Sequence, residues 1–379
     1  MRAVVCQNSE LRVEEIPDPK PAKGHLVLDV VRAGICGSDL HARFHADPVA
    51  DAAANIGFTN MMRLSQAVVM GHEFSGRVRE FGPGTKRRID EGAAVVALPI
   101  VRIDGRPEFL GLSKDAPGAY AERVLVDEAL TFPVPNGLSP ETAALTEPLA
   151  VAYHAVRKAK IGRNETAVVI GCGPIGLAVI LMLRARGVRH IIASDYSAVR
   201  RGLAVRCGAH VVVDPAADSP WTSFADSKYF TDAGKLLHFA LGSIEKLRTV
   251  PFLPWSKALR AAEATGKTPT GPVVFECVGV PGILDHILAS APLYTRVVVV
   301  GVCMERDAIV PITALTKEIA LQFVFAYDPG EFYDTLQLLA DGKVDPTPLV
   351  TSTVDLDGVP GAFDTLGKAD EQAKILVAP

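Results

Sequence analysis

The chain has 379 residues, of which 49% are hydrophobic and 22% are charged, and its formal net charge is -4. This composition is typical of a globular protein with a sizeable core, and it excludes a disordered chain and the strongly basic surface of a nucleic-acid-binding protein. At roughly 150 residues per domain, the length predicts two or three domains.

No segment has the pattern expected for export or for a membrane span. The first residues, MRAVVCQNSELRVEEIPDPKP, lack the apolar core of about 7–15 residues that a signal peptide needs. The longest uncharged apolar run, Ala167–Leu183, contains three glycines and one proline and is shorter than the ~20 residues of a spanning helix. The six cysteines form no CxxC pair. We therefore expect a cytoplasmic protein with reduced thiols that binds neither membranes nor nucleic acid.

The first 150 residues have the pattern of a β-rich domain. Short runs containing valine and isoleucine alternate with glycine and proline, which mark turns and loops. The predicted strands are Ala3–Val5, His25–Val31, Phe74–Phe81, Ala93–Ile100 and Tyr120–Val126.

Two clusters of possible metal ligands lie within this region. The sequence GICGSDLH contains Cys36, and the sequence GHE contains His72 and Glu73. A thiolate, an imidazole and a carboxylate form a candidate catalytic zinc site, because such a site uses three protein ligands and leaves one position for substrate. The spacing alone leaves a structural role open, with Cys36 as a small buried residue and His72 as a solvated one.

A helix is predicted from Ser139 to Lys158. Ser139 suits the N-cap and Pro140 the first helical position. Pro148 is expected to break or kink this helix.

From there the chain alternates between strand and helix patterns. Such alternation predicts βαβ units around a parallel sheet that is buried on both faces. The predicted elements are Ala167–Ile170, Ile175–Arg186, His190–Ser194, Ala198–Gly208, Val211–Val213, Val273–Cys277, Ile283–Ala289 and Arg296–Val300.

A glycine-rich turn predicts a dinucleotide site. The sequence GCGPIG matches GxGxxG, follows a predicted apolar strand directly and opens a predicted apolar helix. The glycines allow a tight turn and a close approach of the pyrophosphate to the helix N-terminus. A plain turn without a ligand is the alternative. The predicted cofactor residues are Gly171, Gly173, Pro174, Ile175 and Gly176, and on later loops Val278, Gly301 and Val302.

Asp195 is expected to set the choice of nucleotide. It follows Gly176 by nineteen residues, at the end of the next predicted strand. Its carboxylate would accept hydrogen bonds from the adenosine ribose and repel a 2′-phosphate, which favours NAD over NADP. Arg200 is also expected at the cofactor, and together with Arg201 it weakens this preference.

Residues 219–270 do not fit the alternation. About sixty residues separate Asp214 from Val273, more than one crossover needs, and they include aromatic residues. We predict an insertion with one or two amphipathic helices, at roughly Thr231–Leu247 and Trp255–Thr265.

Taken together, these motifs resemble the medium-chain dehydrogenase/reductase superfamily. GICGSDLH, GHEFSG, EPLAVAYHAV and GCGPIG occur in order, and they are most similar to the zinc-dependent alcohol, polyol and threonine dehydrogenase branch. The resemblance implies an α/β fold with a GroES-like β-barrel catalytic domain over 1–150, completed by 325–379. A Rossmann domain with a doubly wound parallel sheet would cover 151–324, with its insertion at about 219–270.

The resemblance also implies zinc ligands. Cys36 and His72 match the first two ligands, and Asp39 matches an acid that orients the zinc-binding histidine. Glu73 and Glu147 both match positions whose carboxylate binds or approaches the metal, and the sequence does not choose between them.

The same resemblance implies a proton path. Ser38 matches the hydroxyl that takes the proton of the substrate alcohol, and His41 matches the surface end of a relay through the nicotinamide ribose. A solvated surface histidine is the alternative for His41.

Two features depart from the family pattern. The stretch Val96–Tyr120 contains no cysteine, so we expect one catalytic zinc and no structural zinc. The extra residues Ala42–Gln66 are expected to reshape the mouth of the substrate pocket.

The expected function is therefore hydride transfer between NAD and a primary or secondary alcohol or a polyol, with the corresponding carbonyl as the reverse substrate. The segment Leu321–Tyr327 is expected to be an edge strand through which subunits pair as a homodimer or homotetramer. Two alternatives are a zinc-free, NADP-dependent quinone or enoyl reductase of the same superfamily and a nucleotide-binding protein without catalysis.

Overall fold

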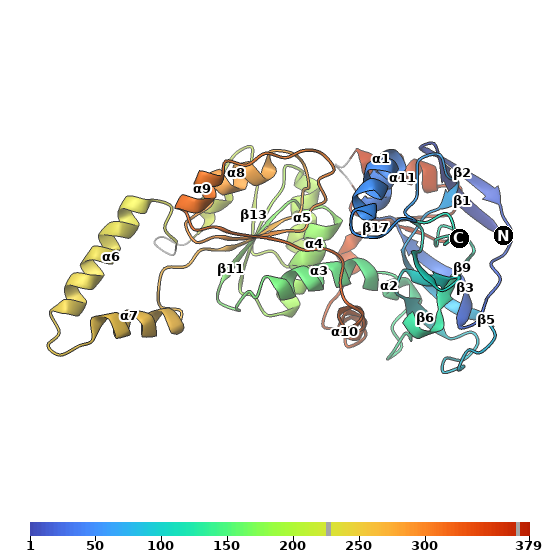
Figure 1. Cartoon of the computed structure of the whole chain (residues 1–379), viewed down its shortest axis with the longest axis horizontal. Helices are drawn as coiled ribbons and strands as arrows, with labels where there is room; N and C mark the ends of the chain where they lie inside the picture. Colours follow the sequence, from blue (N-terminus) through green and yellow to red (C-terminus); the bar gives the residue numbers. More distant parts are fainter. Residues whose placement is uncertain (225–228, 369–371) are drawn as a thin grey trace.

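Two large sheets divide the structure, a mostly antiparallel one near both termini and a parallel one in the middle of the chain (Figure 1). The computed structural model describes residues 1–224, 229–368 and 372–379. Residues 225–228 belong to the predicted insertion, and residues 369–371 belong to the predicted C-terminal completion of the first domain. The predictions for these seven residues therefore lie outside the described residues.

The antiparallel sheet combines strands from the beginning and the end of the chain. Its order is β10-β6-β5-β3-β18-β17, with β9 also paired to β3. The last strand, β18 (Lys374–Val377), pairs antiparallel with β3 (His25–Gly34). The remaining strands of this sheet are β5 (Glu73–Phe81), β6 (Ala94–Ala97), β9 (Arg123–Asp127), β10 (Thr131–Pro133) and β17 (Val350–Val354). Smaller sheets contain β1 (Arg2–Gln7), β2 (Glu10–Glu15) and β4 (Val68–Val69), and β7 (Ile100–Ile103) with β8 (Arg106–Phe109).

The single strand predicted over Ala93–Ile100 is wrong, because the chain forms two strands there. Pro99 separates β6 from β7, and proline has no N–H with which to continue a ladder. The strand predicted from Tyr120 begins only at Arg123, since the N–H of Tyr120 instead donates to the carbonyl of Met70 at 3.0 Å.

The parallel sheet has the strand order of a doubly wound nucleotide-binding fold. It runs β13-β12-β11-β14-β15-β16, so the order reverses between the first strand, β11, and the fourth, β14. Buried apolar side chains cover both faces of this sheet, which confirms the predicted α/β class. Its strands are β11 (Thr166–Ile170), β12 (His190–Ser194), β13 (Val211–Val213), β14 (Val273–Glu276), β15 (Arg296–Val299) and β16 (Ala320–Phe323).

Helices cover the parallel sheet and connect it to the β-rich part. Those of the middle region are α4 (Pro174–Ala185), α5 (Ala198–Cys207), α8 (Ile283–Ser290) and α9 (Pro311–Thr316), with the 3-10 turn η2 (Pro220–Ser223). Helices α3 (Thr146–Lys158) and α10 (Pro329–Ala340) contact each other, and α3 contacts α4. The others are α1 (Gly37–Ala54), α2 (Pro140–Ala143) and α11 (Val359–Gly367), with short turns η1 (Glu128–Leu130) and η3 (Thr347–Leu349).

The helix predicted over Ser139–Lys158 is interrupted, but not at Pro148. Ser139 caps α2 as predicted, and the interruption falls at Ala144 and Leu145. Pro148 lies in the first turn of α3, where its missing N–H costs nothing because a first-turn amide has no partner within the helix.

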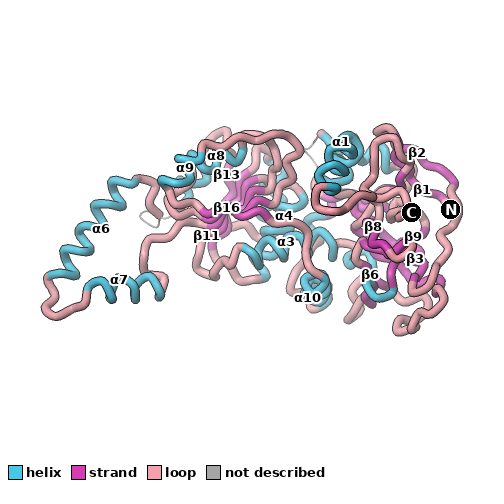
Figure 2. Tube along the Cα trace, viewed as in Figure 1, coloured by secondary structure: helices cyan, strands magenta, loops and turns pink. Residues whose placement is uncertain are grey.

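The predicted insertion forms a helical arm. Helices α6 (Ala233–Arg248) and α7 (Trp255–Ala264) start and end within two residues of their predicted limits, and they extend from the parallel sheet on the side away from the β-rich part (Figures 1 and 2). Within the described residues, no helix combines the length and apolar character needed to cross a membrane.

Candidate active site

The structure brings the thiol of Cys36, the imidazole of His72 and the carboxylate of Glu73 together at one point. One ligand atom from each lies within 4.8 Å of the other two, and no other such cluster occurs among the described residues. Sulfur, imidazole nitrogen and carboxylate oxygen are ligands that zinc takes in catalytic sites. The donor set therefore fits a zinc ion.

Pairing of β3 with β5 creates this cluster. The register places Gly34 opposite Glu73, so Cys36 lies just beyond the end of β3 and next to the start of β5. A side chain at Gly34 would collide with the Glu73 carboxylate, which explains the glycine. Gly71 has φ +99° and turns the chain immediately before His72, a conformation that glycine adopts without strain.

Asp39 holds the ring of His72. Its Oδ1 lies 3.2 Å from Nδ1 of His72, and its Oδ2 accepts hydrogen bonds from the Tyr120 hydroxyl at 2.5 Å and the Cys36 N–H at 3.1 Å. Burial opposes the charge of Asp39, yet His72 and these hydrogen bonds hold its pKa below the ordinary value. The ring is thereby oriented with Nε2 on the side of Ser38, whose Oγ is 3.3 Å away.

The buried side chain of Lys374 forms an ion pair with the carboxylate of Glu73. Nζ of Lys374 lies 2.7 Å from each Glu73 oxygen and donates to the carbonyl of Ile35 at 3.0 Å. Both charged groups are fully buried. Burial alone would lower the pKa of Lys374, but the charge of Glu73 raises it. The sequence analysis did not identify Lys374. The signal was a single lysine in the apolar run KILV, because a lysine that is buried in a strand needs an acidic partner.

Glu147 lies outside the three-residue cluster but close to it. It sits in the first turn of α3 and is almost completely buried. Burial raises the pKa of Glu147 to about 7, and the negative charge of Glu73 acts in the same direction, whereas the charge of His72 and a hydrogen bond to Tyr327 lower it. Burial and the neighbouring Glu147 also raise the pKa of Tyr327. Sequence reasoning did not identify Tyr327, because it belongs to the segment between β16 and α10, far along the chain.

Ser38 and His41 lie on the first turns of α1. Ser38 is beside the cluster, and His41 is half-buried one turn further along. Burial lowers the pKa of His41, as does the nearby charge of His45. At His45 the helix departs from α geometry, with φ -126° and ψ 30°. The segment beyond His41 is thus helical as far as Ala54, which the sequence analysis did not predict.

The glycine-rich turn has the expected conformation. Gly171 has φ +90°, and a Cβ on Gly176 would collide with the carbonyl of Gly171, so both positions require glycine. Gly173 caps α4, and a Cβ there would meet nothing within 4 Å. Pro174 and Ile175 form the first turn of α4, where backbone N–H groups point out of the helix end. The turn therefore leaves open space at a helix N-terminus, where a pyrophosphate binds favourably.

Asp195 follows β12, as predicted. Its carboxylate accepts hydrogen bonds from the N–H of Cys172 at 2.7 Å, within the glycine-rich turn, and from the N–H of Ser197 at 2.8 Å. Arg201 donates to the Asp195 carbonyl at 2.8 Å. Arg200 lies in the first turn of α5, and its N–H donates to Oγ of Ser197 at 3.3 Å. The acid is thus fixed beside the turn by the backbone.

The later loops meet the glycine-rich turn. A Cβ on Gly171 would fall 2.7 Å from Val278 Cγ2, and one on Gly279 would fall 2.7 Å from the N atom of Val302. Buried Glu276 organises these loops, because its carboxylate accepts the N–H groups of Val278 and Gly279 at 2.6 and 2.8 Å. The backbone carbonyl of the same residue accepts the N–H of Gly301 at 2.9 Å. The structure therefore gathers all the predicted loop residues at the carboxyl ends of the strands.

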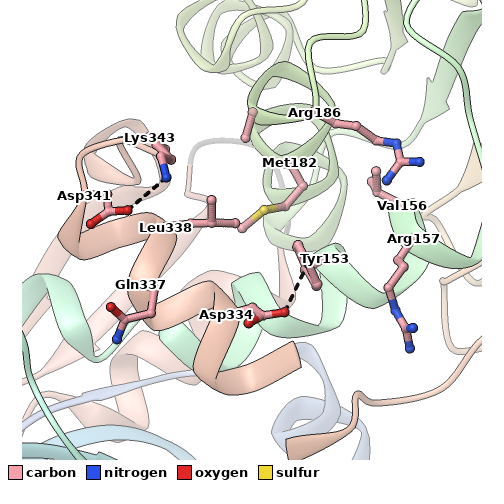
Figure 3. Close-up of a pocket in the computed structure, with 11 residues that line it drawn as sticks. Tyr153, Val156, Arg157, Met182, Arg186, Asp334, Gln337, Leu338, Asp341 and Lys343 are labelled. Atoms are coloured by element: carbon pink, nitrogen blue, oxygen red, sulfur yellow. Dashed lines mark hydrogen bonds and ion pairs between the residues drawn. The ribbon is translucent and has the colours of Figure 1, made fainter. Parts of the chain in front are cut away.

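A separate cavity of about 380 Å³ lies between α3, α4 and α10 (Figure 3). It includes none of the predicted site residues. Two pairs of its polar side chains contact each other, Lys343 with Asp341 at 2.9 Å and Tyr153 with Asp334 at 3.5 Å. We assign this cavity no part in the predicted chemistry.

Comparison with known proteins agrees with the fold and the site. Residues 22–136 match the alcohol dehydrogenase GroES-like domain. The chain is 33% identical over 390 aligned residues to (R,R)-butanediol dehydrogenase of Bacillus subtilis (strain 168), covering 100% of both proteins. It is 26% identical to sorbitol dehydrogenase of Bos taurus, covering 96% of this chain and 92% of that one. The crystal structure of 2R,3R-butanediol dehydrogenase from Bacillus subtilis superposes with a TM-score of 0.74 at 32% identity, covering 100% of this chain and 99% of that one.

The fold and the site define a zinc-dependent, NAD(P)-linked dehydrogenase. The chain belongs to the medium-chain zinc alcohol and polyol dehydrogenase family. The predicted function is thereby confirmed at this level, in preference to the zinc-free reductase and the non-catalytic nucleotide-binding protein.

Proposed function

We propose that this chain oxidises a small secondary alcohol, with a vicinal diol as the preferred substrate class, using one zinc ion and NAD. The observation that carries the proposal is the convergence of Cys36, His72 and Glu73 beside the hydroxyl of Ser38. The similarity to butanediol dehydrogenases supports the substrate class.

In this proposal Cys36, His72 and Glu73 hold the zinc ion, and Glu147 is the alternative carboxylate. When bound, the ion supplies Lewis acidity that lowers the pKa of a substrate hydroxyl. Asp39 keeps the His72 ring in a ligating orientation, since second-shell carboxylates fix both the tautomer and the direction of a metal-binding imidazole. Lys374 balances the charge of Glu73 in the buried site. The cysteine-free stretch Val96–Tyr120 supports one zinc per chain.

Ser38 and His41 are the proposed proton path. In this proposal the hydroxyl of Ser38, which lies beside His72, accepts the substrate proton, and His41, one turn away on α1, passes a proton towards solvent. The depressed pKa of His41 keeps its imidazole neutral near pH 7 and therefore able to accept that proton. We propose both as catalytic residues, together with Glu73.

The nucleotide is proposed to bind at the carboxyl ends of the parallel strands. The glycine-rich turn and the N-terminus of α4 would hold the pyrophosphate, and Asp195 the adenosine ribose. Arg200 and the loops containing Val278, Gly301 and Val302 would complete the contacts. When bound, the nucleotide would supply the hydride acceptor, and the protein would orient the substrate carbon against it and exclude water.

We propose domain limits of 1–150 with 325–379, and 151–324 with the insertion at 219–270. We propose a homodimer or homotetramer that pairs through β16, which forms the end of the parallel sheet. We propose a cytoplasmic location.

A substrate panel tests the proposed activity. Zinc-loaded full-length protein is incubated with NAD or NADP and with vicinal diols, polyols and primary alcohols, and absorbance of the reduced nicotinamide is followed. We expect the highest kcat/KM with a vicinal diol and NAD. A clear preference for primary alcohols would contradict the substrate assignment, and absence of turnover with every alcohol and every matching carbonyl would contradict the function.

Replacing Asp195 with alanine is expected to weaken NAD binding about 10–150-fold, the loss that corresponds to about 1.5–3 kcal/mol for hydrogen bonds to a charged group. NADP binding should change much less, because the Asp195 carboxylate repels the 2′-phosphate of NADP. Removing the carboxylate relieves this repulsion, which offsets the loss of the hydrogen bonds to the ribose. Dissociation constants for both nucleotides can be measured by fluorescence titration. Equal losses for NAD and NADP would remove Asp195 from the ribose contact.

A further inference from the structure

The helical arm, residues 231–270, is attached at the amino ends of the parallel strands. The N–H of Leu293, just before β15, donates to the carbonyl of Phe230 at 2.8 Å. The N–H of Thr166, at the start of β11, donates to the hydroxyl of Tyr229 at 3.2 Å. The glycine-rich turn lies at the opposite, carboxyl ends of the strands. The arm is therefore directed away from the proposed nucleotide site and is not a lid for it (Figure 1).

The arm leaves much of its apolar surface without a partner. Helices α6 and α7, both fully described, contain no buried residue. They are 16 and 10 residues long, and helices of this length are marginal in water unless an apolar face is packed. Leu237 and Leu241, one turn apart on α6, are 63% and 60% exposed, and Phe252 in the connecting turn is fully exposed. These side chains need a surface to cover them.

The arm is attached next to the end of the parallel sheet. Tyr294, adjacent to the residue that holds Phe230, donates its N–H to the carbonyl of Lys317 at 2.8 Å, three residues before β16 begins. Among the described strands, β16 pairs only with β15, so its outer edge is open. Phe323 on β16 and Leu315 on α9 are 68% and 71% exposed. Apolar side chains are thus exposed both on the arm and on the neighbouring sheet edge.

The charge of the arm is opposite to that of the rest of the chain. Residues 231–270 contain six lysines and arginines and three acids, a net charge of +3. The whole chain carries -4, so the remainder carries -7. The remainder of a second copy therefore carries a net charge opposite to that of the arm, and a two-fold axis at the β16 edge would place each arm against the other subunit.

We propose that the arm packs against a second copy of this chain, whose remainder carries a net negative charge, and that the apolar side chains of the arm are covered there, next to paired β16 edges. The proposal extends the β16 pairing proposed above, but it does not depend on the substrate or the nucleotide. It assigns the insertion to assembly and leaves the nucleotide site of each subunit accessible.

Sedimentation velocity of the full-length protein tests this assignment. We expect a dimer or larger assembly, and we expect Leu237→Ser/Leu241→Ser to raise its dissociation constant at least tenfold while circular dichroism shows unchanged folding. Lys246→Glu/Lys257→Glu should weaken assembly in the same direction. Val205→Ser, which removes an exposed apolar side chain on α5, is the matched control and should leave assembly unchanged.

Other outcomes overturn the proposal. A monomeric wild-type protein, or arm variants that assemble like the wild type, would show that the arm does not bind a second copy. If Phe323→Lys abolishes assembly while both arm variants leave it unchanged, the edge pairs without the arm. Binding of the wild type to vesicles of anionic lipid, lost in the arm variants without a change in assembly, would assign the arm to a membrane surface. Turnover per subunit is measured in parallel. Absence of turnover would contradict the proposed activity and would not bear on the proposed assembly.

Discussion

Replacing Cys36 or His72 with alanine is expected to remove bound zinc and to lower kcat/KM on the order of 10³-fold or more. Lewis-acid stabilisation by a metal is worth several kcal/mol, and each 1.36 kcal/mol corresponds to a tenfold change in rate. Each residue supplies one of the three ligand atoms that the structure gathers within 4.8 Å, so the remaining two do not retain the ion. Zinc content by mass spectrometry and kcat/KM by nicotinamide absorbance are measured on the same samples.

Two matched variants separate loss of metal from loss of fold. Cys207→Ala removes a buried thiol from α5, and His190→Ala removes an exposed imidazole at the start of β12. Both controls should keep zinc and activity. Full activity in Cys36→Ala or His72→Ala would show that the cluster does not hold the catalytic metal, whatever the controls do.

Lys374→Met is expected to destabilise the zinc-free protein by about 3–5 kcal/mol, because it leaves the Glu73 carboxylate buried without a counter-charge. Added zinc should recover part of this loss, since the ion supplies positive charge to the same carboxylate. Urea unfolding with and without zinc, after removal of metal by a chelator, measures both effects.

The double variant Glu73→Gln/Lys374→Met is the control for this prediction. It removes both charges while retaining similar side-chain volumes, so it should be more stable than Lys374→Met in the absence of zinc. If the two variants are equally unstable, the contribution of Lys374 comes from packing rather than from its charge. If zinc destabilises Lys374→Met or leaves it unchanged, Glu73 is not in contact with the ion.

Local features were predictable from the sequence where local sterics decide the outcome. Gly171 and Gly176 have backbone geometry that other residues cannot adopt there, so their spacing specifies the turn before any tertiary contact forms. The helices of the insertion were predictable because their apolar periodicity is a local property. The prediction that Pro148 breaks the helix was wrong for a related reason. The free-energy cost of a proline depends on its position in the helix, and α3 starts only two residues before Pro148.

The sequence did not decide which carboxylate belongs to the site. Glu73 and Glu147 were equivalent candidates, and the β3–β5 register placed only Glu73 in the cluster with Cys36 and His72. Lys374, which neutralises Glu73, is 301 residues away in the chain. Tyr327, which contacts Glu147, likewise comes from a distant segment. Pattern and spacing do not report contacts between strands and loops so far apart.

The sequence by itself determined the ligand types, the glycine-rich turn and the alternation that specifies a parallel sheet, because each depends on side-chain chemistry or backbone freedom within a few residues. Only the tertiary structure decided that β18 returns to β3 with Lys374, which carboxylate joins Cys36 and His72, and that the arm leaves from the amino ends of the strands. These outcomes depend on strand register and long-range burial, where the free energy comes from contacts between segments that the chain order does not place together.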